Sequence, residues 1–168
     1  LLLAGSNKSL TYLREYFGQR VQEVFGLQFE IVDGRVAPFG TVMKNIRQYK
    51  RMKEVNRRLY QEHFEPFKPD LVISDFEPFC ARWAKRNNVP FISIDNEHLL
   101  THCRLESRPA DWWAWLKADI VTRFYYSGPA AYVILSFFDV PAVKDSVVVV
   151  PPVVRREVFD MKPVEGSH

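Results

Sequence analysis

The sequence predicts an α/β fold built on an open, mainly parallel sheet with helices on both faces. Short apolar runs alternate with helical patterns along the chain. Two of the runs, Leu71 to Ser74 and Phe91 to Ile94, flank a helical pattern, and a crossover helix makes such strands parallel. Both runs are mostly apolar rather than alternating, which is typical of strands buried on both faces. We therefore expect these two runs in the interior of the sheet.

The composition is that of a globular protein. The chain has 168 residues, of which 47% are hydrophobic and 14% aromatic, so one domain is expected. The balance of 23 Lys and Arg against 20 Asp and Glu is only mildly basic and does not predict a nucleic-acid partner. Two cysteines without a CxxC pattern and the absence of a run of about 20 apolar residues predict a protein of the cytoplasm.

The first elements have a β-then-α order. Leu1 to Ala4 is a candidate strand, and a helix is predicted from Ser6 to Gly18. A second short strand is predicted from Phe29 to Val32, followed by an Asp-Gly turn. Because the chain opens inside a strand and stops at an unremarkable residue, we expect it to be part of a longer protein.

A long amphipathic helix is predicted from Thr41 to Glu65, ended by Pro66 and Pro69. Its apolar positions recur at three- and four-residue steps: Val42, Ile46, Tyr49, Met52, Val55, Leu59 and His63. Its other face carries seven basic residues against Glu54: Lys44, Arg47, Lys50, Arg51, Lys53, Arg57 and Arg58. This face is either an ordinary solvated surface or a surface for anionic lipid or a phosphorylated acceptor.

The second half of the chain repeats the alternation of helices and strands. A helix is predicted from Pro78 to Asn87 between the two central strands, and another between Pro109 and Gly128. The apolar stripe of the latter helix comprises Trp113, Leu116, Ile120 and Phe124, and we expect Trp113 to lie in the hydrophobic core. Two further buried strands, 131–137 and 147–150, follow before Pro151.

Polar side chains follow both central strands. Asp75 and Glu77 come after the first, and the second is followed by Asp95, Asn96, Glu97 and His98. Ligands bind outside the carboxyl ends of parallel strands, so we expect both groups at one edge of the sheet, within reach of one small ligand. Capping of the helix near Pro78 is an equal alternative for the first group.

Other chemistry has little support in the sequence. His98 and His102 are spaced i, i+4, but without the HExxH pattern of a zinc site, so no metal site is predicted. The chain has no GxGxxG, GxxxxGK[ST] or GxSxG motif, which argues against dinucleotide binding, phosphate-loop hydrolysis and a nucleophile elbow.

Two motifs resemble those of a family of GT-B-fold glycosyltransferases, the archaeal and bacterial proteins related to the peptidoglycan N-acetylglucosaminyltransferase. These motifs are SDFEP, Ser74 to Pro78, and IDNEH, Ile94 to His98, in which Glu97 replaces the more familiar glutamine. The resemblance implies a Rossmann-like N-terminal domain over residues 1–155, which receives the acceptor, and the start of an interdomain linker over residues 156–168. It also implies a first strand before Leu1.

The resemblance further implies transfer of a sugar from a nucleotide sugar to an acceptor hydroxyl, with no cofactor. The nucleotide sugar would be held mainly by a second domain, so residues 1–168 alone are expected to transfer nothing. Glu97 and His98 are the candidate catalytic residues, and the candidate substrate-binding residues are Asp75, Glu77, Asp95 and Asn96. The expected partners are a carbohydrate or lipid-linked acceptor and, through the basic helix, an anionic membrane surface. The alternatives are a sugar-nucleotide 2-epimerase of the same fold and a non-catalytic module that binds a ligand or partner.

Overall fold

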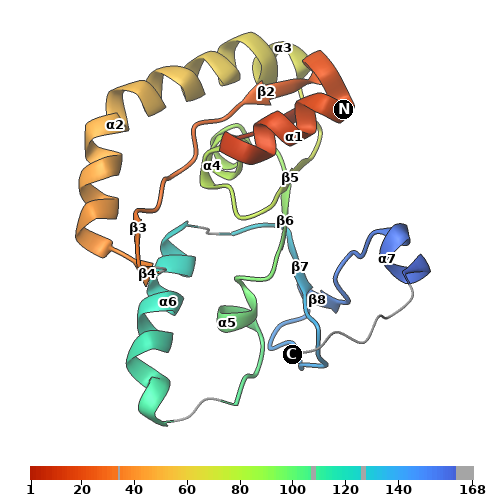
Figure 1. The fold of residues 1–168 in the computed structure, drawn as a ribbon. Helices are drawn as coiled ribbons and strands as arrows, with labels where there is room; N and C mark the ends of the chain where they lie inside the picture. Colours follow the sequence, from red (N-terminus) through yellow and green to blue (C-terminus); the bar gives the residue numbers. More distant parts are fainter. Residues whose placement is uncertain (34, 107–108, 126–127, 162–168) are drawn as a thin grey trace. The chain divides into compact units, whose positions relative to one another are not determined.

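The computed structural model describes residues 1–33, 35–106, 109–125 and 128–161. The chain divides into two compact units, residues 1–91 and residues 92–168. Figure 1 shows the elements of both units along the chain.

The first unit begins with a small parallel βαβ arrangement. Strand β1 (Leu3–Gly5) leads into helix α1 (Asn7–Phe17), a 3-10 turn η1 (Gly18–Arg20) and strand β2 (Val21–Glu23). The strands pair in parallel, with Leu3 opposite Val21 and Gly5 opposite Glu23, so both end at the same edge. The backbone N–H of Val24 donates to the carbonyl of Gly5 at 3.0 Å, which extends the pairing just past β2. The β-then-α opening is therefore confirmed, and β2 is a strand that the sequence analysis missed.

An extended segment, residues 25–30, then leads to a short hairpin of β3 (Ile31–Val32) and β4 (Arg35–Val36). Helix α2 (Pro38–Arg58) holds this segment through side-chain amides. The Asn56 amide accepts from the Phe25 N–H at 2.8 Å and donates to the Phe25 carbonyl at 3.1 Å. Asn45 makes the same two bonds with Gln28, at 3.0 and 2.8 Å. The two asparagines are eleven residues apart, about three helical turns, and so lie on one face of α2.

The orientation of α2 corrects the predicted apolar stripe. Met52 and Leu59 are buried as expected, but Ile46 and two neighbours on the stripe, Val42 and Tyr49, are more than half exposed. The physical reason is that the first half of α2 turns its polar side inward, because the backbone of residues 25–30 has no strand partner among the described residues and needs side-chain hydrogen bonds.

The long helix also extends past the predicted stop at Pro66. Helix α2 continues through a π-helical turn, η2 (Leu59–Phe64), into α3 (Glu65–Phe67), and Figure 1 shows the three in one curved arc. Pro66 lies in α3, which directly follows the π-helical turn, two residues before the end of the helix. The helix ends at Lys68, whose φ of 49° is left-handed.

Strand β5 (Val72–Ser74) and helix α4 (Pro78–Arg86) complete the first unit, and strand β6 (Phe91–Asp95) begins at its last residue. The buried core beneath the long helix includes Trp83, whose ring meets that of Phe64 edge-on at 4.9 Å. The prediction that the Leu71 to Ser74 run is buried on both faces is wrong, because Ile73 is 62% exposed and lines an open cavity.

The second unit is a parallel sheet of β6, β7 (Ala131–Leu135) and β8 (Val147–Val150). Asp95 lies opposite Ile134, and Leu135 lies opposite Val150, so the carboxyl ends of the three strands share one edge. The core is a cluster of buried side chains from the strands and the loop before them: Cys103, Tyr132, Ile134 and Val147. These strands confirm the predicted parallel α/β fold.

The helices of the second unit are α5 (Leu99–His102), the 3-10 turn η3 (Pro109–Asp111), α6 (Trp112–Tyr125) and α7 (Arg156–Asp160). The sequence analysis did not predict α5 or α7. It also placed Trp113 in the core and Ile120 on the apolar stripe of α6, and both side chains are more than half exposed. The buried side chains of α6 include Asp119, which accepts two hydrogen bonds from Arg123 at 2.8 and 3.0 Å. A buried charge that is paired in this way cannot be recognised from the spacing of apolar residues, which is why the predicted apolar face of α6 was wrong.

Candidate functional site

The turn between β5 and α4 shows what Glu77 does in the first unit. Its carboxylate accepts from the backbone N–H of Phe79 at 3.0 Å and of Cys80 at 2.7 Å, so Glu77 is the N-cap of α4. Ser74 closes the turn, because its hydroxyl donates to the Glu77 carbonyl at 2.9 Å. The capping alternative is therefore confirmed for Glu77, while its predicted contact with substrate stays a prediction.

The same turn carries a backbone conformation that is rare for a bulky residue. Phe76, between Asp75 and Glu77, has a φ of 44°. Such residues cost on the order of 1 kcal/mol or more, and they are concentrated at functional turns. The left-handed residue reverses the chain directly after β5, which leaves Asp75 exposed at the end of the strand.

A cavity of about 830 Å³ lies along β5 within the first unit. One wall is formed by residues 1–6 and Leu13, another by residues 68–75, and Phe64 and Phe67 contribute from the long helix. Most of the strand residues in these walls are apolar, and Asp75 and Glu77 line the cavity where β5 ends. Burial raises the pKa of Glu77 above its ordinary value, and the N–H groups of Cys80 and Phe79 offset part of this increase.

Asp95 and His98 form a buried pair in the second unit, directly after β6. His98 is 1% exposed, and its Nδ1 lies 2.8 Å from both carboxylate oxygens of Asp95. The Asp95 carboxylate also accepts from the His98 backbone N–H at 3.0 Å and from the Ser93 hydroxyl. A carboxylate at Nδ1 fixes the orientation of the imidazole and favours the proton on that nitrogen.

The electrostatics of this cluster follow from burial and from these bonds. Burial would raise the pKa of Asp95, but the hydrogen bonds from His98 and Ser93 outweigh it, so the pKa lies below its ordinary value. The ring of His102 lies near that of His98, with 5.4 Å between the ring centres. Burial and the nearby charge of His98 lower the pKa of His102 to about 4. Asp95 is thus held as a carboxylate and His102 as a neutral imidazole at neutral pH.

Asn96 and Glu97 lie between the two members of the buried pair and differ from them in exposure. Asn96 is exposed, Glu97 is partly exposed, and the Glu97 carboxylate accepts from the Asn96 backbone N–H at 3.2 Å. The bonds between Asp95 and His98 close the loop around these two residues. Of the four residues predicted in this loop, Asn96 and Glu97 are therefore the ones that a ligand can contact.

The neighbouring strand contributes aromatic side chains that the sequence analysis missed. It extended β7 to Phe137, but the strand ends at Leu135, and Phe137 is 88% exposed directly beyond it. Ser136 turns the chain, because its hydroxyl donates to the Phe138 carbonyl at 2.6 Å and accepts from the Phe138 N–H. Since β6 and β7 are parallel neighbours, the polar loop and the exposed aromatic residues lie at one edge of the sheet. The sequence feature that could have indicated these exposed aromatic residues is the Phe137–Phe138 pair directly before Asp139.

The structure thus groups the predicted residues by unit. Asp95, Asn96, Glu97 and His98 lie together in the second unit, and Asp75 and Glu77 lie together in the first. That both groups reach one ligand stays a prediction. Over the described ranges, no group of three His, Cys, Asp or Glu side chains is placed to hold a metal ion. None of the described helices is long and apolar enough to cross a bilayer.

A parallel sheet flanked by helices, with polar loops at its carboxyl edge, defines an α/β domain of the Rossmann-like class. The chain belongs to glycosyl transferase family 1, whose model matches residues 1–168. This match supports a glycosyltransferase-type function and a carbohydrate-type acceptor. No curated protein and no solved structure matches the chain.

Proposed function

We propose that the chain is the acceptor-binding domain of a GT-B glycosyltransferase related to the peptidoglycan N-acetylglucosaminyltransferase, acting with a nucleotide-sugar donor. The observation that carries the proposal is the family match over residues 1–168. The loop of residues 95–98 supports it, because it combines an exposed amide and a carboxylate beside an exposed aromatic residue. Amides, carboxylates and aromatic faces are the groups that bind sugar hydroxyls and sugar rings.

In this proposal Glu97 is the catalytic residue of the loop and His98 is a positioning residue. The Glu97 carboxylate accepts the proton of the acceptor hydroxyl while the hydroxyl oxygen attacks the anomeric carbon of the donor. The bond from that carbon to the diphosphate breaks, and the nucleoside diphosphate leaves with the electron pair. His98 is too deeply buried to contact an acceptor, and instead it holds the loop through Asp95.

The test is transfer by the protein encoded by the uninterrupted parent reading frame, measured as release of nucleoside diphosphate from a panel of nucleotide sugars. Glu97→Gln keeps the size of the side chain and removes the base, so kcat should fall by about a hundredfold or more. Glu106→Gln, an exposed position in the same unit, is the matched control and should leave kcat unchanged. Activity of Glu97→Gln within twofold of wild type would remove Glu97 from the chemistry.

Two other outcomes decide between the alternative functions. Interconversion of a nucleotide sugar and its 2-epimer without any acceptor would identify a 2-epimerase instead. Binding of a sugar without turnover of any donor would identify a non-catalytic module. For residues 1–168 alone we expect no transfer, because the proposal assigns donor binding to a second domain.

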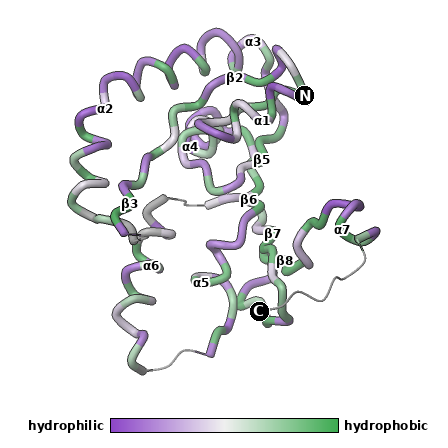
Figure 2. The backbone as a smooth tube through the Cα atoms, viewed as in Figure 1, coloured by the Kyte–Doolittle hydropathy of each residue, from purple (hydrophilic) through white to green (hydrophobic). Residues whose placement is uncertain are grey.

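We also propose that helix α2 binds an anionic membrane surface, which would bring a lipid-linked acceptor to the site. Four apolar residues near the start of α2 are exposed at three- and four-residue steps, led by Phe39 at 80% and including Val42, Ile46 and Tyr49. Lys50, Lys53 and Arg57 continue the same face, because they follow at further steps of three and four residues. In Figure 2, short hydrophobic stretches interrupt α2, which is otherwise largely hydrophilic. An exposed apolar stripe beside cations is typical of helices that lie on membranes.

Vesicle co-sedimentation tests this surface. Binding should require anionic lipid and should weaken as salt increases, since each cation contributes about 1 kcal/mol and the attraction is screened over roughly 8 Å at physiological salt. Ile46→Asp should abolish binding because it places a charge on the apolar stripe. Thr11→Asp, at an exposed position on α1, is the matched control. Vesicle binding that depends neither on the salt concentration nor on the fraction of anionic lipid would contradict the proposal.

A further inference from the structure

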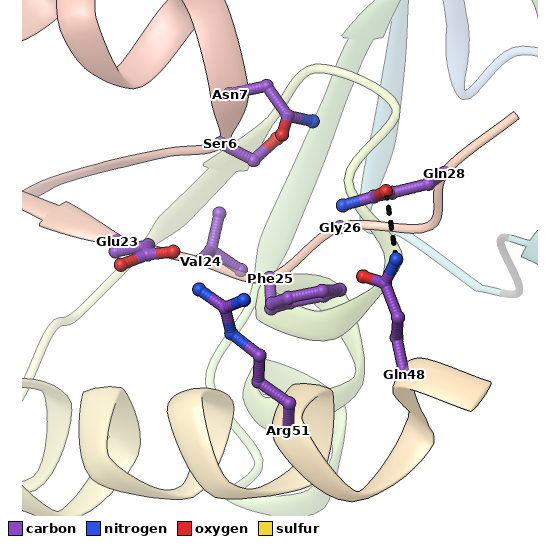
Figure 3. A pocket seen from close by; sticks show the side chains of 9 residues that line it. All are labelled: Ser6, Asn7, Glu23, Val24, Phe25, Gly26, Gln28, Gln48 and Arg51. Carbon is purple, nitrogen blue, oxygen red and sulfur yellow. Dashed lines mark hydrogen bonds between the residues drawn. The ribbon is translucent and has the colours of Figure 1, made fainter. Parts of the chain in front are cut away.

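A second cavity, smaller and more polar than the first, lies in the first unit where β1 and β2 end. Its volume is about 290 Å³. Six of the nine residues around it have polar side chains, and the complete set is Ser6, Asn7, Glu23, Val24, Phe25, Gly26, Gln28, Gln48 and Arg51. Figure 3 shows Arg51 and Gln48 rising from α2 toward the segment that carries Glu23, Phe25 and Gln28. The cavity is therefore an open one, lined by two strand ends, the start of α1 and one face of α2, all in the same unit.

The walls of this cavity are fixed by hydrogen bonds that do not use its polar side chains. Asn56 holds the backbone of Phe25, and Asn45 holds the backbone of Gln28, each through two bonds. The Val24 N–H is held by the Gly5 carbonyl. A site with a rigid backbone loses little conformational entropy when a ligand binds.

The side chains around the cavity offer donors and acceptors in balance. Glu23 and Arg51 supply one negative and one positive charge, and these charges form no ion pair with each other in the described part of the chain. The Arg51 guanidinium lies 5.7 Å from the centre of the Phe25 ring, which holds it toward the cavity. Gln48 donates to the Gln28 side-chain carbonyl over a long 3.5 Å, so both amides keep hydrogen-bonding capacity for a ligand.

Gly26 keeps the cavity open. A Cβ added at this position would lie 3.3 Å from the Ser6 hydroxyl oxygen, closer than an ordinary contact. Any larger side chain would therefore enter the space between the strand ends and α2. The φ of Gly26 is not in the left-handed region, so backbone conformation does not require a glycine here. The requirement is steric, because a side chain would contact Ser6.

We propose that this cavity binds one neutral, polyhydroxylated ring the size of a monosaccharide. A carboxylate accepts from two adjacent hydroxyls, a guanidinium donates to two, and the amides and hydroxyl do either, which matches the alternating donors and acceptors of a sugar. The balanced charge disfavours phosphate, and the volume is at the lower end of about 300–1,000 Å³ for ligand pockets, too small for a nucleotide. That the ring belongs to the acceptor rests on the proposed function; the binding itself does not.

The experiment is amide NMR of the 168-residue chain titrated with D-glucose, D-mannose and N-acetyl-D-glucosamine, with inorganic phosphate in parallel. At least one sugar should produce saturable shifts at residues 5–7 and 23–28. Glu23→Gln and Arg51→Gln should each weaken its Kd by roughly fivefold or more, since each removes a charged hydrogen-bonding group. Arg86→Gln removes the same charge from an exposed position at the end of α4, away from the residues that line the cavity, is the matched control, and should leave Kd unchanged.

Gly26→Val supplies an independent steric test, with its fold checked by circular dichroism. It should abolish the sugar shifts while leaving the spectrum of the second unit unchanged. Shifts with phosphate but no sugar would identify an anion site and overturn the proposal, as would the absence of any shift or sugar shifts that survive Glu23→Gln. Binding here without glycosyl transfer by the full protein would refute the proposed function alone. Transfer whose acceptor KM is unaffected by Glu23→Gln would refute the acceptor role of this cavity alone.

Discussion

We expect the side chain of Asn56 on α2 to make a large contribution to the stability of the first unit, although it is polar and buried. Its side chain is 3% exposed and binds both backbone groups of Phe25, which is itself buried. Asn56→Ala leaves the Phe25 N–H and carbonyl buried without these partners. Each such group costs about 1–3 kcal/mol, so the loss of partners for both should lower the free energy of unfolding by about 2–6 kcal/mol. This is a large part of the 5–15 kcal/mol that is typical of whole domains.

Two related variants show whether the hydrogen bonds are the cause. Asn56→Asp keeps the acceptor for the Phe25 N–H but sets a carboxylate oxygen against the Phe25 carbonyl, and so it should also be destabilising. Asn45→Ala removes the equivalent bonds to Gln28, but that site is only partly buried, so water can replace them. Its cost should be near 1 kcal/mol.

The assay is urea denaturation followed by far-UV circular dichroism, since α2 contributes much of the helical signal of the first unit. The midpoint should fall while the m-value stays constant, which indicates a change in stability alone. Hydrogen exchange at the Phe25 amide gives a local measure, and protection should be lost in Asn56→Ala. A loss below about 0.5 kcal/mol, the usual scatter of surface substitutions, would refute the role assigned to these bonds.

Two further predictions concern buried groups. The pKa of His102 falls from 6.5 to about 4 through burial and the charge of His98, so the unfolded chain takes up a proton first as pH decreases and stability should fall between pH 6.5 and about 4. His102→Gln should flatten this part of the pH profile, and an unchanged profile would contradict the burial argument. Burial and the nearby Glu77 carboxylate raise the pKa of the Cys80 thiol well above its ordinary value, so a thiol reagent should modify Cys80 only as fast as the unit unfolds. Rapid modification of the native protein would show that the α4 face is open.

The elements with local sequence signals were the ones that could be predicted from the sequence. A run of apolar residues between turn signals identified the positions of β5, β6, β7 and β8, and the crossover helix between the first two indicated parallel strands. The same reasoning identified the Asp95 to His98 loop as the end of a strand, and the structure places it there. These signals are local because a strand buried in a parallel sheet needs apolar side chains wherever it passes through the core.

The orientation of the helices was decided only by tertiary packing. The apolar spacing of α2 predicted that Ile46 faces the core, yet the helix turns Asn45 and Asn56 inward to satisfy the backbone of residues 25–28. A hydrophobic pattern cannot reveal this, because the demand for hydrogen bonds comes from an extended segment about twenty to thirty residues away. The same holds for α6, where Asp119 is buried and accepts its hydrogen bonds from the exposed Arg123, while Trp113 is exposed.

For the candidate site, too, part of the description follows from the sequence and part only from the tertiary structure. The sequence by itself determined which loops carry acidic and amide side chains, since those residues follow apolar strands directly. Only the tertiary structure separated their roles, with Glu77 capping a helix, His98 buried against Asp95, and Glu97 accessible to a ligand. It also created the cavity between Glu23 and Arg51, because these residues meet only when two parallel strand ends are packed against a long helix. Residue type and spacing specify the chemistry of a side chain, but its accessibility and its partners depend on which distant backbone it packs against.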